Sequence, residues 1–436
     1  MGRIIRTMQT LKKRLLADYR SDLSHSGING ERLASRLDTL SQIGATEGGG
    51  SYRIGFSEKE REAKDTVKEW MNQAGLEIRE DGAGNVFGRL SGKQNDLPAV
   101  MSGSHVDTVP NGGHFDGTLG VLSALEVVEA WREADFQPHR PFEIAIFTDE
   151  EGARFNGGLT GSQAMAGELD LEQKRKLKDI YNVPFDQVMK NYGLSPDGLL
   201  HAKRNLKEIH TFVEVHIEQG KRLEKADAPV GIVTGIAGPC WLEVKFKGAA
   251  GHAGNTPMND RKDALVAASE FILKIKSLPE SVSSSAVATV GKLEVHPNGA
   301  NVIPGEVELF VDIRDIQEET RGKLVNLVMN EAEEIADKHG VEVTQKETMK
   351  VQPVPIQEQL SEKLAQSAAN QGLQAVFLPS GAAHDAMTIG HHLPVAMLFV
   401  QSKNGISHNP EEWSSLNDCI YGVHVLKDFL ESLVND

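Results

Sequence analysis

The chain has 436 residues, 39% of them hydrophobic and 25% charged, which is long enough for two domains and typical of a globular protein. Its formal net charge of −16 argues against a nucleic-acid or anionic-membrane surface and favours a small-molecule partner. Cys240 and Cys419, the two cysteines, lie far apart without metal-ligand spacing, so we expect reduced thiols and a cytoplasmic location.

The first segment, residues 1–16 (MGRIIRTMQTLKKRLL), is basic. Charged residues interrupt each of its apolar runs, so it has neither the apolar stretch of a signal peptide nor that of a membrane span. We expect an amphipathic helix or a frayed extension here.

The next two hundred residues alternate helical and strand-like patterns, as in an α/β domain. Ser57 and Glu60 form a capping box that predicts the start of one helix. The predicted helices are 29–43, 57–75 and 119–132, and the predicted strands are 76–79, 85–90, 99–101, 141–148 and 211–217. A helix at 171–177 and the polar stretch that continues to about residue 207 are expected to form excursions on the surface.

The pattern changes near Gly235. The elements predicted after it are a strand at 241–247, a helix at 260–278, strands at 286–295 and 307–313, a helix at 318–338 and a strand at 341–344. This β-α-β-β-α-β order is that of a ferredoxin-like sandwich, which forms a complete two-layer domain. The α/β pattern then resumes, with a helix at 360–370 and strands at 375–378 and 393–400. We therefore expect a discontinuous α/β domain with a mixed sheet at 1–235 and 350–436, and an inserted domain at 236–349.

Histidine or acidic residues lie at or just after the carboxyl ends of three of the predicted strands. These are His105 with Asp107, the pair Glu150-Glu151, and His216. Because ligands of α/β sheets bind at the carboxyl ends of the strands, we expect these side chains to form one site.

The residue types suit a pair of divalent metal ions. Two ions about 3.5 to 4 Å apart need a carboxylate that bridges them, together with imidazoles or carboxylates that complete each set. The candidates are His105, Asp116, Glu151, His216 and His408. The ions could be Zn²⁺, Mn²⁺, Co²⁺ or Ni²⁺.

Two acidic residues remain beside these candidates. Neighbouring side chains on an extended chain diverge, so Glu150 is free to act as a general base while Glu151 binds metal. Asp107 can accept the imidazole N–H of His105 and fix its tautomer. Plainer interpretations stay open: a solvated acidic loop for Glu150-Glu151, a core histidine for His216 and a surface turn for His408.

Several motifs occur in order along the chain: GSHVDTVPNGGHFDG, FTDEEGARFNGGLTGSQAMAG, HIEQG, GIAG, AGHAGNTPM, NVIPG, DIRD, LPSGAAHDA and ISHNPEEW. Together they resemble the bacterial N-carbamoyl-L-amino-acid hydrolases, which share a group with allantoate amidohydrolase and β-ureidopropionase in the M20 metallopeptidase-like superfamily. The resemblance runs from about Asn29 to the C-terminus. It implies that Asp116 bridges two metal ions per subunit, with His105 and His216 on one ion and Glu151 and His408 on the other. Many peptidase relatives have a carboxylate in place of His216, so this histidine favours an amidase.

The resemblance implies that the inserted domain is a lid and dimerisation domain, which predicts a homodimer. It places His252 at the oxyanion, in the same or the partner subunit, and Asn301 and Arg314 at a substrate carboxylate. The planar fork of arginine suits such a carboxylate. Arg314 could instead form an ion pair at a strand edge, and His252 could be an ordinary loop residue. Further pocket contacts are expected from Gln219, Gly381 and His384.

The expected function is metal-dependent hydrolysis of the ureido group of N-carbamoyl-L-amino acids to an amino acid, carbon dioxide and ammonia. Allantoate amidohydrolases tend to carry Gln where this chain has Pro239, which disfavours but does not remove allantoate as the substrate. A peptidase or deacylase of the same fold is a further alternative, and a non-catalytic binding protein is another. The full set of candidate site residues argues against the last of these.

Overall fold

The computed structural model describes residues 10–436, and the chain divides into two compact units. Unit 1 comprises the chain up to Val233 together with Ile356–Leu378 and His384–Asp436, and unit 2 comprises Thr234–Pro355 and Pro379–Ala383. The first predicted boundary lies close to Val233. The second unit reaches Pro355 rather than residue 349, and it includes a short segment near residue 380 that the sequence assigns to the α/β domain.

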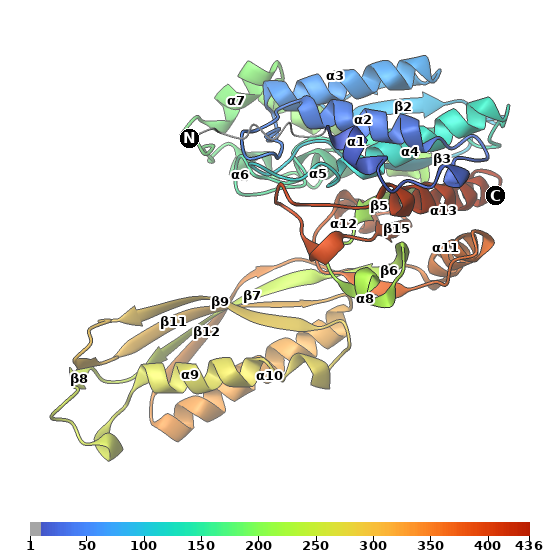
Figure 1. The fold of residues 1–436 in the computed structure, drawn as a ribbon. Helices are drawn as coiled ribbons and strands as arrows, with labels where there is room; N and C mark the ends of the chain where they lie inside the picture. Colours follow the sequence, from blue (N-terminus) through green and yellow to red (C-terminus); the bar gives the residue numbers. More distant parts are fainter. Residues whose placement is uncertain (1–9) are drawn as a thin grey trace, which may run out of the picture. The chain divides into compact units, whose positions relative to one another are not determined.

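The mixed α/β fold predicted for unit 1 is confirmed by its large sheet (Figure 1). The strands are β1 (Glu77–Glu80), β2 (Val86–Leu90), β3 (Ala99–His105), β4 (Phe142–Phe147), β5 (Ile209–Ile217), β6 (Val230–Ile236), β14 (Phe377–Ser380) and β15 (Val395–Val400). They lie in the order β1-β2-β4-β3-β5-β15-β6, and β14 also pairs with β6. The four central strands, β4, β3, β5 and β15, are parallel, so their carboxyl ends lie at one edge. The structure adds β6, which the sequence pattern did not single out.

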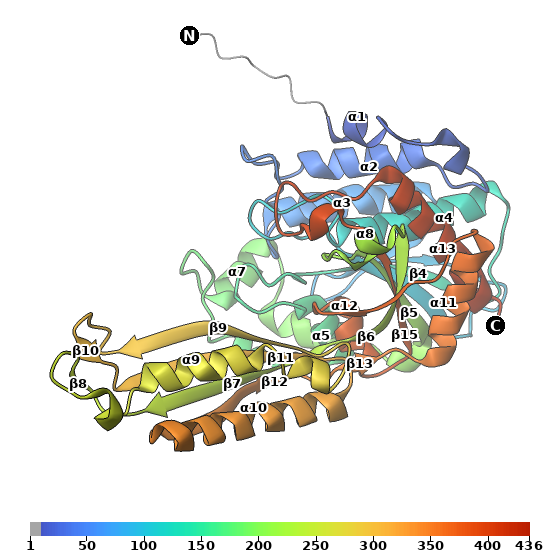
Figure 2. The same cartoon turned by 60° about the horizontal axis from the view of Figure 1, so that its bottom comes forward.

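The helices of unit 1 are α1 (Leu11–Leu15), α2 (Gly30–Gln42), α3 (Glu58–Gln73), α4 (Thr118–Glu133), α5 (Thr160–Ala166), α6 (Leu171–Lys174), α7 (Phe185–Tyr192), α8 (Arg222–Ala226), α11 (Glu358–Asn370), α12 (Asp385–Gly390) and α13 (Leu416–Val434). As predicted, Ser57 caps α3 by accepting the N–H of Glu60. Helices α4 and α13 contact each other and the central strands, and both are buried along most of their length (Figure 2). The sequence pattern did not single out α13.

The polar stretch before β5 is not the surface excursion that the sequence predicts. It forms a small core of its own, in which Phe185, Val188 and Leu199 are almost completely buried. Phe185 packs edge-on against Phe56, with the ring centroids 6.4 Å apart. The sequence did not predict this core, because its apolar residues are scattered among charged ones. No single helix in this stretch is long enough to show a clear hydrophobic period.

Unit 2 is a four-stranded antiparallel sheet with two long helices on one face (Figures 1 and 2). Its main elements are β7 (Gly238–Lys247), α9 (Ala264–Ile275), β9 (Val287–His296), β11 (Glu306–Asp315), α10 (Glu318–His339) and β12 (Glu342–Lys350). The element order is thus β-α-β-β-α-β, and the strands lie in the order β12-β7-β11-β9. A separate pair is formed by β8 (Gly251–His252) and β10 (Val302–Ile303), and β13 (Val354–Pro355) pairs with the end of β6. A buried core lies between the sheet and its helices.

At the start of the described chain, Thr10 caps α1, which buries Leu11 and Leu15. The rest of the predicted N-terminal helix lies outside the described residues. Within residues 10–436, no helix combines the length and the apolar character that crossing a bilayer requires. Cys240 and Cys419 are both buried and free.

Candidate metal centre

The carboxyl edge of the central strands carries most of the predicted site residues. His105 is the last residue of β3, and His216 lies one residue before the end of β5. The segment after β4 supplies Glu151, the segment after β15 supplies His408, and the loop between β3 and α4 supplies Asp116. The parallel register places the ends of β3, β4, β5 and β15 together, which brings residues from distant parts of the sequence to one place.

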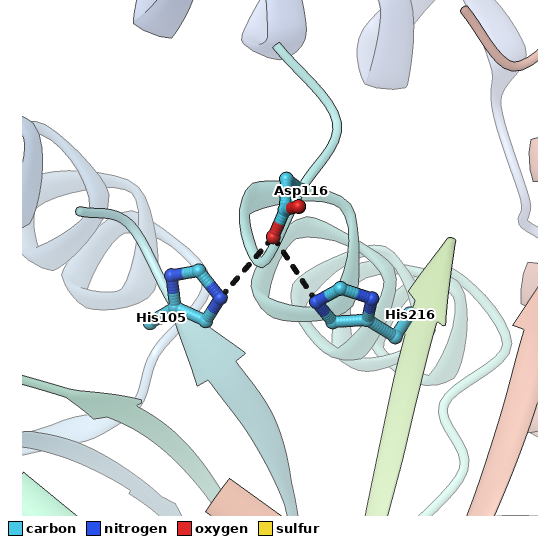
Figure 3. Close-up of side chains that lie close together, drawn as sticks. All are labelled: His105, Asp116 and His216. Carbon is cyan, nitrogen blue, oxygen red and sulfur yellow. Dashed lines mark ion pairs between the residues drawn. The ribbon is translucent and has the colours of Figure 1, made fainter. Parts of the chain in front are cut away.

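The first group of side chains, which we call the inner cluster, consists of His105, Asp116 and His216. One carboxylate oxygen of Asp116, Oδ1, lies 3.4 Å from Nε2 of His105 and 3.2 Å from Nε2 of His216 (Figure 3). All three residues are buried. The inner cluster therefore turns two imidazole nitrogens toward a single carboxylate oxygen.

Backbone carbonyls fix the orientation of both imidazoles. Nδ1 of His105 is 3.1 Å from the carbonyl oxygen of Asp107, and Nδ1 of His216 is 3.0 Å from that of Ile217. A neutral ring whose Nδ1–H donates to a carbonyl presents an unprotonated Nε2, which is the form that binds a metal ion. Nε2 of His105 is buried without a hydrogen-bond partner. This nitrogen is therefore available as a ligand for a metal ion.

The second group, the outer cluster, consists of Asp116, Glu151 and His408. Nε2 of His408 lies 3.5 Å from Oδ2 of Asp116 and 3.2 Å from Oε2 of Glu151. Asp116 thus turns Oδ1 to the inner cluster and Oδ2 to the outer cluster. A carboxylate in this arrangement can bridge two cations.

The charged side chains of the two clusters lie close together and shift one another's pKa values. Burial would raise the pKa of Asp116, but His216, His105 and His408 outweigh burial and hold that pKa well below its usual range. Hydrogen bonds to Asp116 and Glu151 raise the pKa of His408 to about 10. The metal-free site therefore favours a protonated His408 between two carboxylates, a position that a metal ion would take by displacing the proton.

Glu150 and Glu151 diverge, as the sequence predicts for neighbours. Glu150 faces the inner cluster, with Oε2 3.5 Å from Nε2 of His105. It belongs to neither of the two clusters that could hold an ion. Burial raises the pKa of Glu150 well above its usual range, and nearby carboxylates, first that of Asp385, add to the effect. A buried carboxyl group of raised pKa can both accept and return a proton near neutral pH.

Asp107 makes a different contact from the predicted one. Its backbone carbonyl, rather than its carboxylate, is the hydrogen-bond acceptor for His105, and Oδ1 lies farther away, at 3.5 Å from Nδ1. The carboxylate oxygens instead accept the backbone N–H groups of Glu150 and Glu151, both at 3.2 Å. A carboxylate satisfies two adjacent N–H groups in this way, so Asp107 fixes the turn that separates the two glutamates.

The donor set suits divalent transition-metal ions. In each cluster the three ligand atoms lie within 4.8 Å of one another, and the atoms are imidazole nitrogens and carboxylate oxygens. These are ligands that Zn²⁺, Mn²⁺, Co²⁺ and Ni²⁺ accept. Among residues 10–436, the inner and outer clusters are the two groups of three or more such side chains with this geometry.

Comparison with known proteins places the chain among metal-dependent enzymes. The sequence pattern of Peptidase family M20/M25/M40 matches residues 101–432. The N-carbamoyl-L-amino acid amidohydrolase of Geobacillus stearothermophilus is 43% identical over 399 residues, which cover 92% of this chain and 97% of that protein. The chain belongs to peptidase family M20/M25/M40.

Other members of the family carry related names. The allantoate amidohydrolase of Bacillus subtilis is 37% identical over 401 residues, which cover 91% of this chain and 96% of that protein. The crystal structure of an amidase of the hydantoinase/carbamoylase family from Burkholderia multivorans has a TM-score of 0.87 and 32% sequence identity, and covers 94% of this chain and 99% of that one. Members of the M20 family are metal-dependent. This M20 chain is a hydrolase that acts on amide C–N bonds.

Two residues of this M20 chain, the half-buried Ser407 and the buried Glu412, were not predicted from the sequence. The Ser407 hydroxyl lies 2.8 Å from Oδ2 of Asp116 and 2.9 Å from Oε2 of Glu412. Gln219, a predicted substrate contact, donates its amide N–H to the same Oδ2 at 2.8 Å. In this structure Gln219 therefore supports the shared carboxylate. The sequence did not indicate a role for Glu412, because nothing in it shows which of the adjacent residues Glu411 and Glu412 points inward.

The other predicted pocket residues fall in both units. In unit 1, His384 is buried with its ring centroid 4.5 Å from that of His216, and burial together with the charge of His216 holds its pKa well below the usual range. In unit 2, Arg314 donates to Asp312 through Nε at 2.9 Å and through Nη2 at 2.7 Å. Its Nη1 donates to the carbonyl of Gly381 at 2.8 Å. Arg314 and Gly381 are thus in contact, and the strand-edge ion pair left open by the sequence is present with Asp312.

His252 and Asn301 lie close together within unit 2. Strand β8, which contains His252, pairs with β10 opposite Val302, and the carbonyl of Asn301 accepts the N–H of Ala253. Nδ1 of His252 accepts the N–H groups of Gly254 and Asn255 at 3.1 and 3.2 Å. The neutral ring therefore carries its proton on Nε2, where it can be donated.

Proposed function

We propose that this chain is a dinuclear metal-dependent amidohydrolase that cleaves the ureido group of N-carbamoyl-L-amino acids and releases the amino acid, carbon dioxide and ammonia. The observation that carries the proposal is the position of Asp116, whose two oxygens face two separate sets of ligand atoms. The name of the relative from Geobacillus stearothermophilus supports this choice of substrate.

The metal ligands follow from the two clusters. Oδ1 of Asp116, with His105 and His216, would hold one ion, and Oδ2 of Asp116, with Glu151 and His408, would hold the other. When bound, such a pair of ions lowers the pKa of water and polarises the carbonyl group that is attacked.

Glu150 is the proposed general base. It lies beside His105 without belonging to either ligand group, and its buried carboxyl has a raised pKa. In the proposed reaction Glu150 accepts a proton from the attacking water and passes it to the leaving nitrogen. Asp107 contributes by fixing the backbone of Glu150 through the hydrogen bond to its N–H.

The residues of unit 2 are proposed to bind the substrate. Nε2–H of His252 would donate to the oxyanion, and Asn301 and Arg314 would bind the carboxylate. A guanidinium has five N–H donors. Asp312 and Gly381 accept from Nε, Nη2 and Nη1 of Arg314, which leaves one N–H on each Nη for a carboxylate. We propose that this unit acts as the lid of the enzyme.

A cavity in unit 2 supports an apolar substrate side chain. It has a volume of about 370 Å³ and is lined by Trp241, Gly291, Lys292, Phe310 and Asp312. Since Asp312 also pairs with Arg314, a substrate whose carboxylate binds Arg314 would hold its side chain close to this cavity. Allantoate carries a second ureido group in place of a side chain and would gain little from an apolar surface.

A homodimer formed through unit 2 is the proposed assembly. Large apolar side chains are exposed on α9 and on the outermost strand β9: Val266, Leu273, Val287 and Leu293. Exposed apolar patches of this kind are typical of interfaces. We expect light scattering to give the mass of a dimer for the native chain and that of a monomer for Leu273→Asp.

The proposed location is the cytoplasm, in agreement with two free thiols.

The second candidate function is allantoate hydrolysis, favoured by the relative from Bacillus subtilis, and the family's peptidases make a third. Ammonia release by metal-reconstituted enzyme separates them, with N-carbamoyl-L-amino acids, their D forms, allantoate and dipeptides as substrates. We expect the highest kcat/KM for an N-carbamoyl-L-amino acid with an apolar side chain. A higher value for allantoate would establish the second candidate, and cleavage of dipeptides without ammonia release would establish the third.

A variant tests the proposed carboxylate site. Arg314→Ala removes a charge-assisted contact worth about 1.5 to 3 kcal/mol, so we expect KM for carboxylated substrates to rise roughly 10- to 100-fold with a smaller change in kcat. Arg20→Ala, at an exposed position in unit 1, serves as the control. An unchanged KM in Arg314→Ala would remove Arg314 from the binding site.

A further inference from the structure

We propose that Glu412 is a positioning residue that fastens the loop of Asp116 to the loop of His408 and thereby sets the metal affinity of the outer cluster. This inference rests on the two-metal site proposed above. It concerns a residue that neither binds metal in that proposal nor contacts the substrate.

The contacts of Glu412 join two loops that lie far apart in the sequence. Its Oε1 accepts the backbone N–H of Phe115 at 2.9 Å and that of Asp116 at 3.2 Å. Its Oε2 lies 2.9 Å from the hydroxyl of Ser407, the residue before His408. One carboxylate therefore holds the backbone of one ligand and the neighbour of another.

The same connection reaches the metal-facing oxygen of Asp116. The Ser407 hydroxyl lies within hydrogen-bond distance of both Oε2 of Glu412 and Oδ2 of Asp116, and Gln219 donates to that Oδ2 from a third segment. Oδ2 is the oxygen that faces the outer cluster. Glu412 thus acts on the outer cluster through Asp116 and through Ser407 at once.

The packing leaves the Glu412 carboxylate little freedom. Glu412 is 2% exposed, and a Cβ atom added to Gly113 would lie 2.0 Å from its Oε1, so the Asp116 loop passes directly over the carboxylate. Next to it, the rings of Phe115 and Trp413 pack edge to face with centroids 5.7 Å apart. The hydrogen bonds are therefore made in a dry, closely packed place, where an unmade bond is costly.

The outer cluster depends on this fastening more than the inner cluster does. The inner imidazoles stand on strands and are oriented by the carbonyls of Asp107 and Ile217, with no contribution from Glu412. The outer cluster needs the loops of Asp116 and His408 at a fixed separation. Loosening their connection therefore weakens the binding of the ion in the outer cluster more than in the inner cluster, where Asp116 is the one ligand that Glu412 supports.

Titration of metal-free full-length protein with Zn²⁺, followed by calorimetry, tests the proposal. Glu412→Gln keeps the volume but removes the negative charge and replaces one carboxylate oxygen with an amide nitrogen, which cannot accept a hydrogen bond. We expect the weaker of two Zn²⁺ sites to lose affinity roughly 10- to 100-fold, the usual effect of altering a residue that orients metal ligands. The tighter site should lose clearly less affinity, because only its Asp116 ligand depends on Glu412. Glu411→Gln, at the exposed neighbouring position, should match the wild type at both sites.

A second variant keeps the test decisive if Glu412→Gln folds poorly. Ser407→Ala removes one hydroxyl from the same connection, so we expect a smaller loss of affinity confined to the weaker site. Unchanged dissociation constants in both variants, or an equal loss at the two sites, would overturn the role of Glu412. If the wild type bound a single ion, the two-metal proposal would itself fail, and that outcome is visible before any variant is examined.

Discussion

The inner and outer clusters share Asp116 but are built in different ways. The inner histidines stand on strands β3 and β5, and their side chains are 1 and 2% exposed. In the outer cluster the His408 side chain is 50% exposed, and His408 has a positive φ of 55° in a loop after β15. Glu151 lies in a turn after β4 that Asp107 holds through backbone N–H groups.

The difference shows how one carboxylate can serve two sites of unequal rigidity. The register of the parallel strands and two backbone carbonyls place the two histidines of the inner cluster before any ion is present. The outer cluster forms only when loops from distant parts of the chain meet, and ordering a loop costs conformational entropy. We therefore expect the inner cluster to bind its ion more tightly.

The largest effect is expected from Asp116→Ala, because it removes the one ligand common to both clusters. Both ions lose affinity, and with them the activation of water and the polarisation of the carbonyl. We expect kcat/KM to fall by about 10⁴-fold or more. Metal analysis of the purified variant and an ammonia-release assay measure the two consequences. Asp96→Ala, at an exposed position, is the control. A variant that retained both ions would show that the clusters do not depend on Asp116.

Glu150→Gln should have the next largest effect and should separate proton transfer from metal binding. Glu150 lies near the inner cluster but outside both ligand groups, so we expect normal metal content. The loss of a general base lowers kcat roughly 10²- to 10⁴-fold. Loss of metal from the variant, measured by elemental analysis, would instead make Glu150 a ligand.

Much of this arrangement could be read from the sequence because it depends on strands. Apolar runs such as 141–148 that end in acidic residues indicate the carboxyl edge of a sheet, where the structure places His105 and His216 as predicted. The β-α-β-β-α-β order of unit 2 also followed from hydrophobic periodicity. The helix α13 was not predicted, although its apolar residues Leu416, Ile420, Val423 and Leu430 recur at helical spacing.

The contacts between loops could not be read from the sequence. The selection of Glu412 over Glu411 depends on a turn within the His408 loop, and the carboxylate of Asp107 bonds the turn of the glutamates rather than His105. The order of residues along a chain does not fix such contacts, because loop conformation depends on the elements packed around it. The same holds for Arg314, whose pairing with Asp312 was one of two interpretations open from the sequence.

Replacing one histidine in each cluster should sharpen the comparison. We expect His408→Ala to bind one ion per chain with near-normal affinity and to lose the second. His216→Ala should weaken the tighter site by more than about 100-fold, since loss of a ligand exceeds the 10- to 100-fold effect of losing its support. Calorimetric titration with Zn²⁺ measures both, with the exposed His201→Ala as the control. If both variants lost the same ion, the two clusters would not be separate sites.

The smallest effect is expected in the pH dependence of the metal-free protein. In the folded state Asp116 and Glu151 raise the pKa of His408 from 6.5 to about 10. The protonated imidazole therefore stabilises the fold fully below its ordinary pKa, and this contribution disappears as pH rises through about 10. We expect the free energy of unfolding of chelator-treated protein to fall more steeply between pH 7 and 10 in the wild type than in His408→Gln, measured by urea denaturation. Groups that do not contact His408 ionise alike in both proteins, so their contribution cancels in the comparison. Equal slopes would mean that His408 is not held between the two carboxylates in the metal-free state, and that the outer cluster is assembled by the ion itself.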